Sequence, residues 1–129
     1  MKTIPKNFPI ALAACLLAGA ALSAGIDVDG ELMRGVDDTA KSLDSNVAMK
    51  DGKAAAVDAR SLVETFARIE SHYGETPDTA DAVGFAHRTG ELAAQALKAI
   101  ESQDFDAAGD AVNQLTRSCK SCHEKYKKD

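Results

Sequence analysis

From residue 25 onward, apolar residues recur every three or four positions in four successive stretches. This spacing is typical of the buried face of an amphipathic helix, and it predicts helices at about 29–50, 53–73, 77–102 and 105–127. Links of only a few residues join the stretches, so consecutive helices are expected to run antiparallel. The pattern therefore predicts an all-α, up-down-up-down antiparallel four-helix bundle. The residues expected on its buried faces are, in chain order, Leu32, Met33, Val36, Ala40, Leu43, Val47, Ala55, Ala59, Leu62, Phe66, Ile69, Tyr73, Ala82, Phe85, Thr89, Leu92, Ala96, Ile100, Phe105, Ala108, Val112, Leu115, Cys119, Cys122 and Tyr126.

The links between these stretches carry signals for the ends of helices. Asp51 and Gly52 predict the end of the first helix, because this pair favours a turn and a C-cap. Thr76 and Pro77 predict the N-cap and the first residue of the third helix. Asp104 predicts the N-cap of the fourth helix.

The first 24 residues have the pattern of a targeting segment rather than of a folded domain. Lys2 and Lys6 form a basic start, residues 8–22 are mostly apolar, and Ser23 and Ala24 offer a cleavage site. This order predicts a secretory signal peptide, too short and too rich in alanine for a stable membrane span. We therefore expect residues 1–24 to be removed, leaving a mature domain at 25–129 in the periplasm.

A second interpretation of the leader concerns Cys15. The run Leu12-Ala13-Ala14-Cys15 resembles a lipoprotein processing box, in which Cys15 would be acylated and retained as a lipid anchor. The apolar run continues through Leu22, whereas a mature lipoprotein usually turns polar after its cysteine. The released form is favoured, and the anchored form stays as the alternative.

The charge of the mature chain limits its partners. The whole chain has 15 basic and 20 acidic residues. Removal of Lys2 and Lys6 with the leader leaves 13 basic residues, and the net charge falls from −5 to −7. This balance argues against nucleic-acid binding. It suits a partner protein with a basic patch.

One short run, Cys119-Lys120-Ser121-Cys122-His123, carries distinctive chemistry. A Cys-x-x-Cys-His run is the attachment motif of c-type haem. The two thiols add to the two vinyl groups of the porphyrin, and the imidazole binds the iron on its proximal side. On a helix, these three side chains share one face. The motif predicts one covalent haem c at one end of the bundle, held by Cys119 and Cys122, with His123 as an iron ligand.

Three other uses of the motif were weighed. A zinc site would need a fourth ligand, and the sequence has no second Cys/His pair at zinc spacing. A thioredoxin-like redox pair would need a strand before the helix, and no stretch predicts a strand. A structural disulfide would leave His123 without a role. Haem attachment is favoured over all three.

The predicted topology indicates which residues lie near the iron. The end of the fourth helix should lie beside the start of the first helix, which puts Met33 at the haem end on a buried face. Thioether sulfur is a normal ligand of haem iron, although a Met on an apolar face usually serves packing. His72 and His87 are weaker candidates, since His72 lies at a helix end and His87 lies off the buried seam. Met49 lies at the opposite end and is set aside.

These features together resemble the cytochrome c-prime family, the class II c-type cytochromes. The resemblance rests on the Cys-Lys-x-Cys-His run near the C-terminus, on Tyr126 three residues after the His, and on the four-helix pattern over about 27–127. It implies haem on Cys119 and Cys122, with His123 as the proximal ligand. The family often has Arg where this chain has Lys127. Homodimers through the first two helices are common in the family, but no exposed apolar stripe in the sequence demands one.

The resemblance leaves two functions open. Low-spin members place a Met of the first helix on the iron and carry electrons, and Met33 falls where that ligand would come from. High-spin members leave the sixth position open and bind small gases such as nitric oxide. We expect the protein to be an exported electron carrier, with His123 and Met33 as axial ligands of the iron. We do not expect it to be an enzyme. A five-coordinate gas-binding protein is the alternative.

Overall fold

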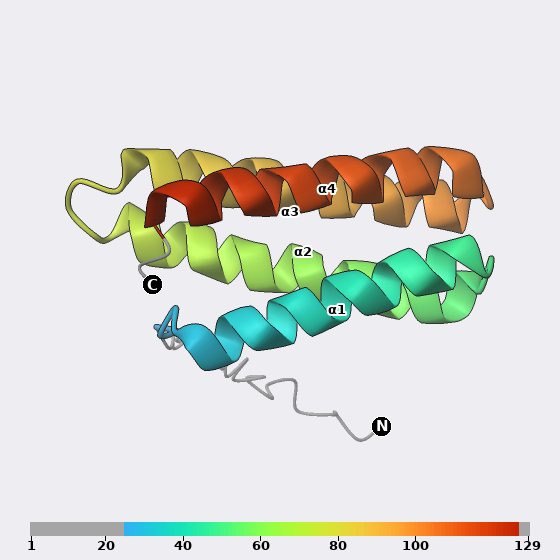
Figure 1. The fold of residues 1–129 in the computed structure, drawn as a ribbon, viewed down its shortest axis with the longest axis horizontal. Coiled ribbons are helices and arrows are strands. Elements are labelled where there is room, and N and C mark those ends of the chain that lie inside the picture. Colours follow the sequence, from blue (N-terminus) through green and yellow to red (C-terminus); the bar gives the residue numbers. More distant parts are fainter. Residues whose placement is uncertain (1–24, 127–129) are drawn as a thin grey trace, which may run out of the picture.

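The computed structural model describes residues 25–126, and these form four helices that pack side by side (Figure 1). The signal peptide predicted at 1–24, with Cys15, and Lys127 lie outside the described residues. The all-α four-helix bundle expected from the sequence is confirmed. The helices are α1 (Gly30–Ala48), α2 (Gly52–Gly74), α3 (Ala80–Glu101) and α4 (Phe105–Tyr126).

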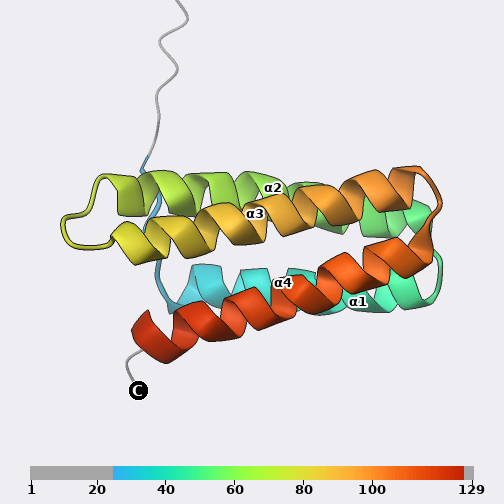
Figure 2. The same cartoon turned by 90° about the horizontal axis from the view of Figure 1, so that it is seen from above.

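Successive helices run in opposite directions and form a ring in the order α1, α2, α3, α4 (Figures 1 and 2). The contact between α2 and α3 is the most extensive, and the contact between α1 and α4, which closes the ring, is the sparsest. In Figure 1, α1 and α4 lie farther apart at the end that holds the start of α1 and the end of α4. The bundle is therefore least tightly closed at the end that carries the cysteine–histidine motif.

The predicted buried faces make up most of the core. Leu43, Leu62 and Leu115 are at most 1% exposed, and each lies on a different helix. Burial of leucine side chains of this kind contributes about 1.5–3 kcal/mol each to folding. Nine residues expected on the seams are only partly buried, and most of them lie toward the ends of the bundle: Leu32, Met33, Ala40, Tyr73, Phe85, Phe105, Cys119, Cys122 and Tyr126.

The turn between α1 and α2 differs from the prediction. The first helix ends at Ala48 with Met49 as its C-cap, and Lys50 adopts the left-handed conformation with φ 58°. Asp51 is the N-cap of α2 instead of the end of α1, because its side chain accepts a hydrogen bond from the backbone N–H of Ala54 at 3.1 Å. Gly52 is the first residue of α2. The Asp-Gly pair was a start signal here, and its interpretation as an end signal was wrong.

The start of α3 also differs. The helix begins at Ala80, three residues later than Pro77. Asp78 has φ 61°, which interrupts a helix, and the hydroxyl of Thr76 donates to the carbonyl of His72 instead of capping α3. The hydroxyl of Thr79 likewise donates to preceding carbonyls. By contrast, Asp104 accepts from the backbone N–H of Ala107 at 3.1 Å at the start of α4, as predicted.

None of α1 to α4, within residues 25–126, is both long and apolar enough to cross a membrane.

Candidate haem-attachment site

The cysteine–histidine motif lies in the last two turns of α4. Cys119, Cys122 and His123 are each partly buried, and Cys119 packs against the hydrophobic core. No disulfide joins the two cysteines. Two unpaired thiols and one imidazole on the same side of a helix are the donor set that covalent haem requires. The residues present therefore fit that group.

The environment of the thiols keeps them protonated near neutral pH. Burial is the largest cause that raises the pKa of Cys119, followed by the neighbouring Cys122, while the Asp37 carboxylate adds a smaller contribution. Burial alone raises the pKa of Cys122.

Aromatic rings from α2 and α4 cover the other flank of the motif. The ring centroids of Tyr73 and Tyr126 are 6.2 Å apart, and His72 meets Tyr73 edge-on at 5.3 Å. Burial and then the neighbouring Cys122 thiol raise the pKa of Tyr73.

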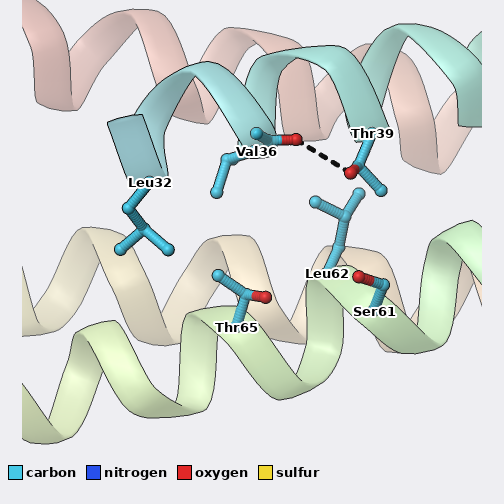
Figure 3. A pocket seen from close by; sticks show the side chains of 7 residues that line it. Leu32, Val36, Thr39, Ser61, Leu62 and Thr65 are labelled. Atoms are coloured by element: carbon cyan, nitrogen blue, oxygen red, sulfur yellow. Dashed lines mark hydrogen bonds between the residues drawn. The ribbon is translucent and has the colours of Figure 1, made fainter. Parts of the chain in front are cut away.

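Two surface hollows identify which sides of α1 face its neighbours. A hollow of about 250 Å³ between α1 and α2 is lined by Leu32 and Thr39 of α1 and by Ser61 and Thr65 of α2 (Figure 3). These α1 residues therefore mark the side of α1 that faces α2. Met33, the residue after Leu32, is turned by about 100° from it around the helix.

The second hollow, of about 350 Å³, lies between the end of α1 and the start of α4. Asp44 of α1 and Phe105 of α4 are among the residues that line it. Met33 is eleven residues, about three turns, before Asp44, and His123 is eighteen residues, about five turns, after Phe105. Met33 and His123 therefore have nearly the same angular positions on α1 and α4 as these two lining residues.

The register of α1 and α4 along the bundle axis puts Met33 and His123 at the same level. Near one end, a β-carbon built on Gly109 would lie 4.0 Å from Val47. Ten residues before Val47 on α1 is Asp37, and ten residues after Gly109 on α4 is Cys119, whose pKa that carboxylate raises. The two helices run in opposite directions with the same rise per residue, so both counts lead toward the same end of the bundle. Four more residues along each helix in that direction reach Met33 on α1 and His123 on α4.

The other candidate ligands occupy different places. The side chain of His87 is 58% exposed and contacts the carboxylates of Glu70 and Glu91, at 3.2 and 3.4 Å. Its predicted exposure is confirmed. The ring of His72 packs edge-on against Tyr73, near the end of α2 and at the end of the bundle that carries the cysteine–histidine motif. The sequence instead predicts that His72 caps the helix or is solvated. Met49, set aside from the sequence, is 69% exposed at the opposite end.

Within residues 25–126, no three His, Cys, Asp or Glu side chains gather closely enough to hold a metal ion between them. The same residues contain no strand that would set up a thioredoxin-like pair.

Sequence reasoning missed three neighbours of the motif: Asp37, Tyr73 as a cover for Cys122, and Ser118. Ser118 is buried, and its hydroxyl lies 2.7 Å from that of Thr89. Thr89 was expected on a buried face, and a buried hydroxyl needs a partner. The requirement of the Thr89 hydroxyl for a hydrogen-bond partner was the one available signal. Nothing in the sequence identifies Ser118 as that partner.

Comparisons with known proteins returned no match: no family model, no curated protein and no solved structure resembles the chain closely enough to be reported.

Proposed function

We propose that this chain is an exported c-type cytochrome of the cytochrome c-prime kind, which carries one haem and transfers electrons between proteins. The observation that carries the proposal is the close approach of Gly109 to Val47, which sets the α1–α4 register and so supports a place for Met33 at the level of His123. An imidazole and a thioether are the axial ligand pair of many electron-carrying cytochromes. The Cys-x-x-Cys-His motif and the four-helix fold support the same class.

The residues have separate roles in this proposal. The sulfurs of Cys119 and Cys122 would hold the haem through thioether bonds, and the imidazole of His123 would bind its iron. When bound, the haem supplies one-electron iron chemistry. Met33 would be the second protein ligand of the iron and would keep other ligands out, so that the chain would need no substrate site. Tyr73, beside Cys122, limits the access of water to that attachment point.

The acidic surface supports a protein partner. With the leader removed, the net charge of −7 would steer the carrier toward a basic patch, and this attraction weakens as salt screens it. Export to the periplasm would also bring the two thiols into a compartment where c-type haem is attached.

Attachment is tested by extraction of the purified mature protein with acidified acetone. The haem should stay with the polypeptide, and in Cys119→Ser/Cys122→Ser it should be lost. Complete loss of colour from the unaltered protein would contradict the proposal. Mass spectrometry of the same sample should give a mature N-terminus at residue 24 or 25, whereas a lipid on Cys15 would replace the released form with the anchored one.

The sixth ligand is tested with Met33→Ala and its matched control Met49→Ala. We expect the unaltered protein and Met49→Ala to be low-spin, with the weak long-wavelength band of methionine-ligated ferric haem. Met33→Ala should lose this band and become high-spin. If the unaltered protein is already high-spin and Met33→Ala changes nothing, Met33 is not a ligand, and the five-coordinate protein that binds nitric oxide replaces the electron carrier.

A further inference from the structure

Two hydroxyl side chains stand out in an otherwise apolar core. Among residues 25–126, Thr89 of α3 and Ser118 of α4 are the buried polar residues, with 2% and 6% of their surface exposed. Their oxygen atoms are 2.7 Å apart. The hydroxyl of Thr89 also donates to the backbone carbonyl of Phe85, at 2.7 Å. Since a hydroxyl has a single proton to donate, Ser118 must be the donor to Thr89.

This short chain of hydrogen bonds is satisfied in one arrangement of α3 and α4. If α4 slid by one turn, about 5.4 Å, Ser118 would leave Thr89 and a buried hydroxyl would lose its partner. A satisfied buried pair contributes little net free energy, whereas an unsatisfied member is costly. Buried polar pairs of this kind select one register among several that an apolar interface would tolerate.

The rest of the buried α3 face consists of four alanines together with Leu92 and Ile100. Helix packing is set by side-chain ridges that alanine does not provide, so only the two larger residues resist sliding. An ion pair between Asp81 and Lys125 also links the two helices, but both side chains are more than half exposed. Exposed ion pairs contribute little to stability. The alanines are Ala82, Ala86, Ala93 and Ala96.

Ser118 immediately precedes Cys119, so the same contact fixes the position of the haem motif. We propose that the Thr89–Ser118 pair is a register lock, which positions Cys119, Cys122 and His123 along the bundle and keeps His123 level with Met33. Thr89 and Ser118 are positioning residues and do not bind the haem. The effect on the haem rests on the proposed function above, whereas the lock itself does not.

The lock is tested with Thr89→Val, which removes the hydroxyl and keeps the shape, and Thr89→Ser, which keeps the hydroxyl. Thr116→Val is the matched control, because that hydroxyl donates only within its own helix, to the carbonyl of Val112 at 3.1 Å. NMR contacts between the side chains at 89 and 118 in the mature protein report the register. We expect Thr89→Val to lose or split these contacts, and Thr89→Ser and Thr116→Val to keep one set.

Energetic coupling gives a second measure. Unfolding equilibria of Thr89→Val, Ser118→Ala and the double variant form a cycle in which neighbouring residues interact. Each single substitution changes the unfolding equilibrium constant by a certain factor. We expect the factor measured for the double variant to differ at least about fivefold from the product of the two single factors. Unchanged NMR contacts in Thr89→Val together with additive effects would overturn the lock.

The positioning role needs a readout at the haem. We expect Thr89→Val to shift the reduction potential and to weaken the methionine-ligation band, while Thr89→Ser restores both and Thr116→Val leaves both unchanged. A changed register with an unchanged potential and band would overturn the positioning role and leave the lock in place. If the unaltered protein holds no haem, the proposed function fails, and the NMR and coupling measurements still decide the lock.

Discussion

The cap of α1 controls the turn that carries Met33. One carboxylate oxygen of Asp29 accepts hydrogen bonds from the backbone N–H groups of Glu31, at 3.0 Å, and Leu32, at 2.8 Å. Replacement of an N-cap Asp by Ala costs about 0.5–2 kcal/mol. Because α1 has its sparsest contact with α4, we expect Asp29→Ala to fray the first turn of α1 without unfolding the bundle.

The size of the effect follows from the cost of the cap. A loss of about 1 kcal/mol raises the population of the frayed state about fivefold. In the proposed function, an added ligand such as imidazole reaches ferric haem only when Met33 has left, so its binding rate should rise by the same factor. The backbone N–H of Met33, which donates to the carbonyl of Asp29 at 3.1 Å, should exchange with solvent faster to a similar extent.

A matched control separates local fraying from general destabilisation. Asp51 caps α2 at the opposite end of the bundle through the N–H of Ala54, so Asp51→Ala should cost a comparable free energy. We expect Asp51→Ala to leave the imidazole binding rate within about twofold, and Asp29→Asn to behave like the unaltered protein. An equal rise in Asp29→Ala and Asp51→Ala would refute local control by the cap. Faster exchange with no change in imidazole binding would refute the role of Met33.

Three further outcomes are expected. Leu43→Ala, at a position with 0% exposure, should lower the free energy of unfolding by about 2–5 kcal/mol in urea titrations, against about 0.5 kcal/mol or less for the exposed Val57→Ala. Lys50→Gly should stabilise the protein by about 1 kcal/mol in the same assay, since Lys50 has φ 58°, and Lys50→Ala should not. In protein made without haem, burial raises the pKa of Cys119 above its ordinary 9.0, so the unfolded chain loses that proton first. The free energy of unfolding should therefore fall as pH rises past about 9, less steeply in Cys119→Ser, and an equal fall in both would contradict this assignment.

Much of the fold could be predicted from the sequence because the spacing of apolar residues repeats over many turns. A period of three to four that persists for about twenty residues leaves little choice but a helix, and Leu43, Leu62 and Leu115 are buried where that period puts them. Short links then imply antiparallel neighbours. These conclusions depend on many residues at once, so no single unusual residue overturns them.

The helix ends depend on single hydrogen bonds, and there the sequence was ambiguous. Thr76 and Pro77 have the types expected at the start of a helix, but the hydroxyl of Thr76 bonds backward to α2. Asp51 could close α1 or open α2, and only the direction of its side chain decides between them. Ser, Thr and Asp side chains have several local backbone partners of similar energy, which is why residue type alone does not settle such cases.

The site was predictable in part. The sequence put Met33 and His123 at the same end of the bundle, but their common level depends on the register between helices that are about seventy residues apart in the chain. That register comes from contacts such as Val47 with Gly109. The bond between Thr89 and Ser118 depends in the same way on how α4 is rotated against α3. Such quantities follow from packing and have no local signature.

The sparse closure between α1 and α4 has a consequence for how this protein folds and diversifies. Helices α2, α3 and α4 have the more extensive contacts, so α1 is expected to dock last and to open first. In the proposed function, the anchor of the haem belongs to the early-folding part, and the sixth ligand arrives with the late one. In the proposed function, selection on α1 alone would suffice to exchange electron transfer for gas binding, because α4, which would hold the haem, need not change.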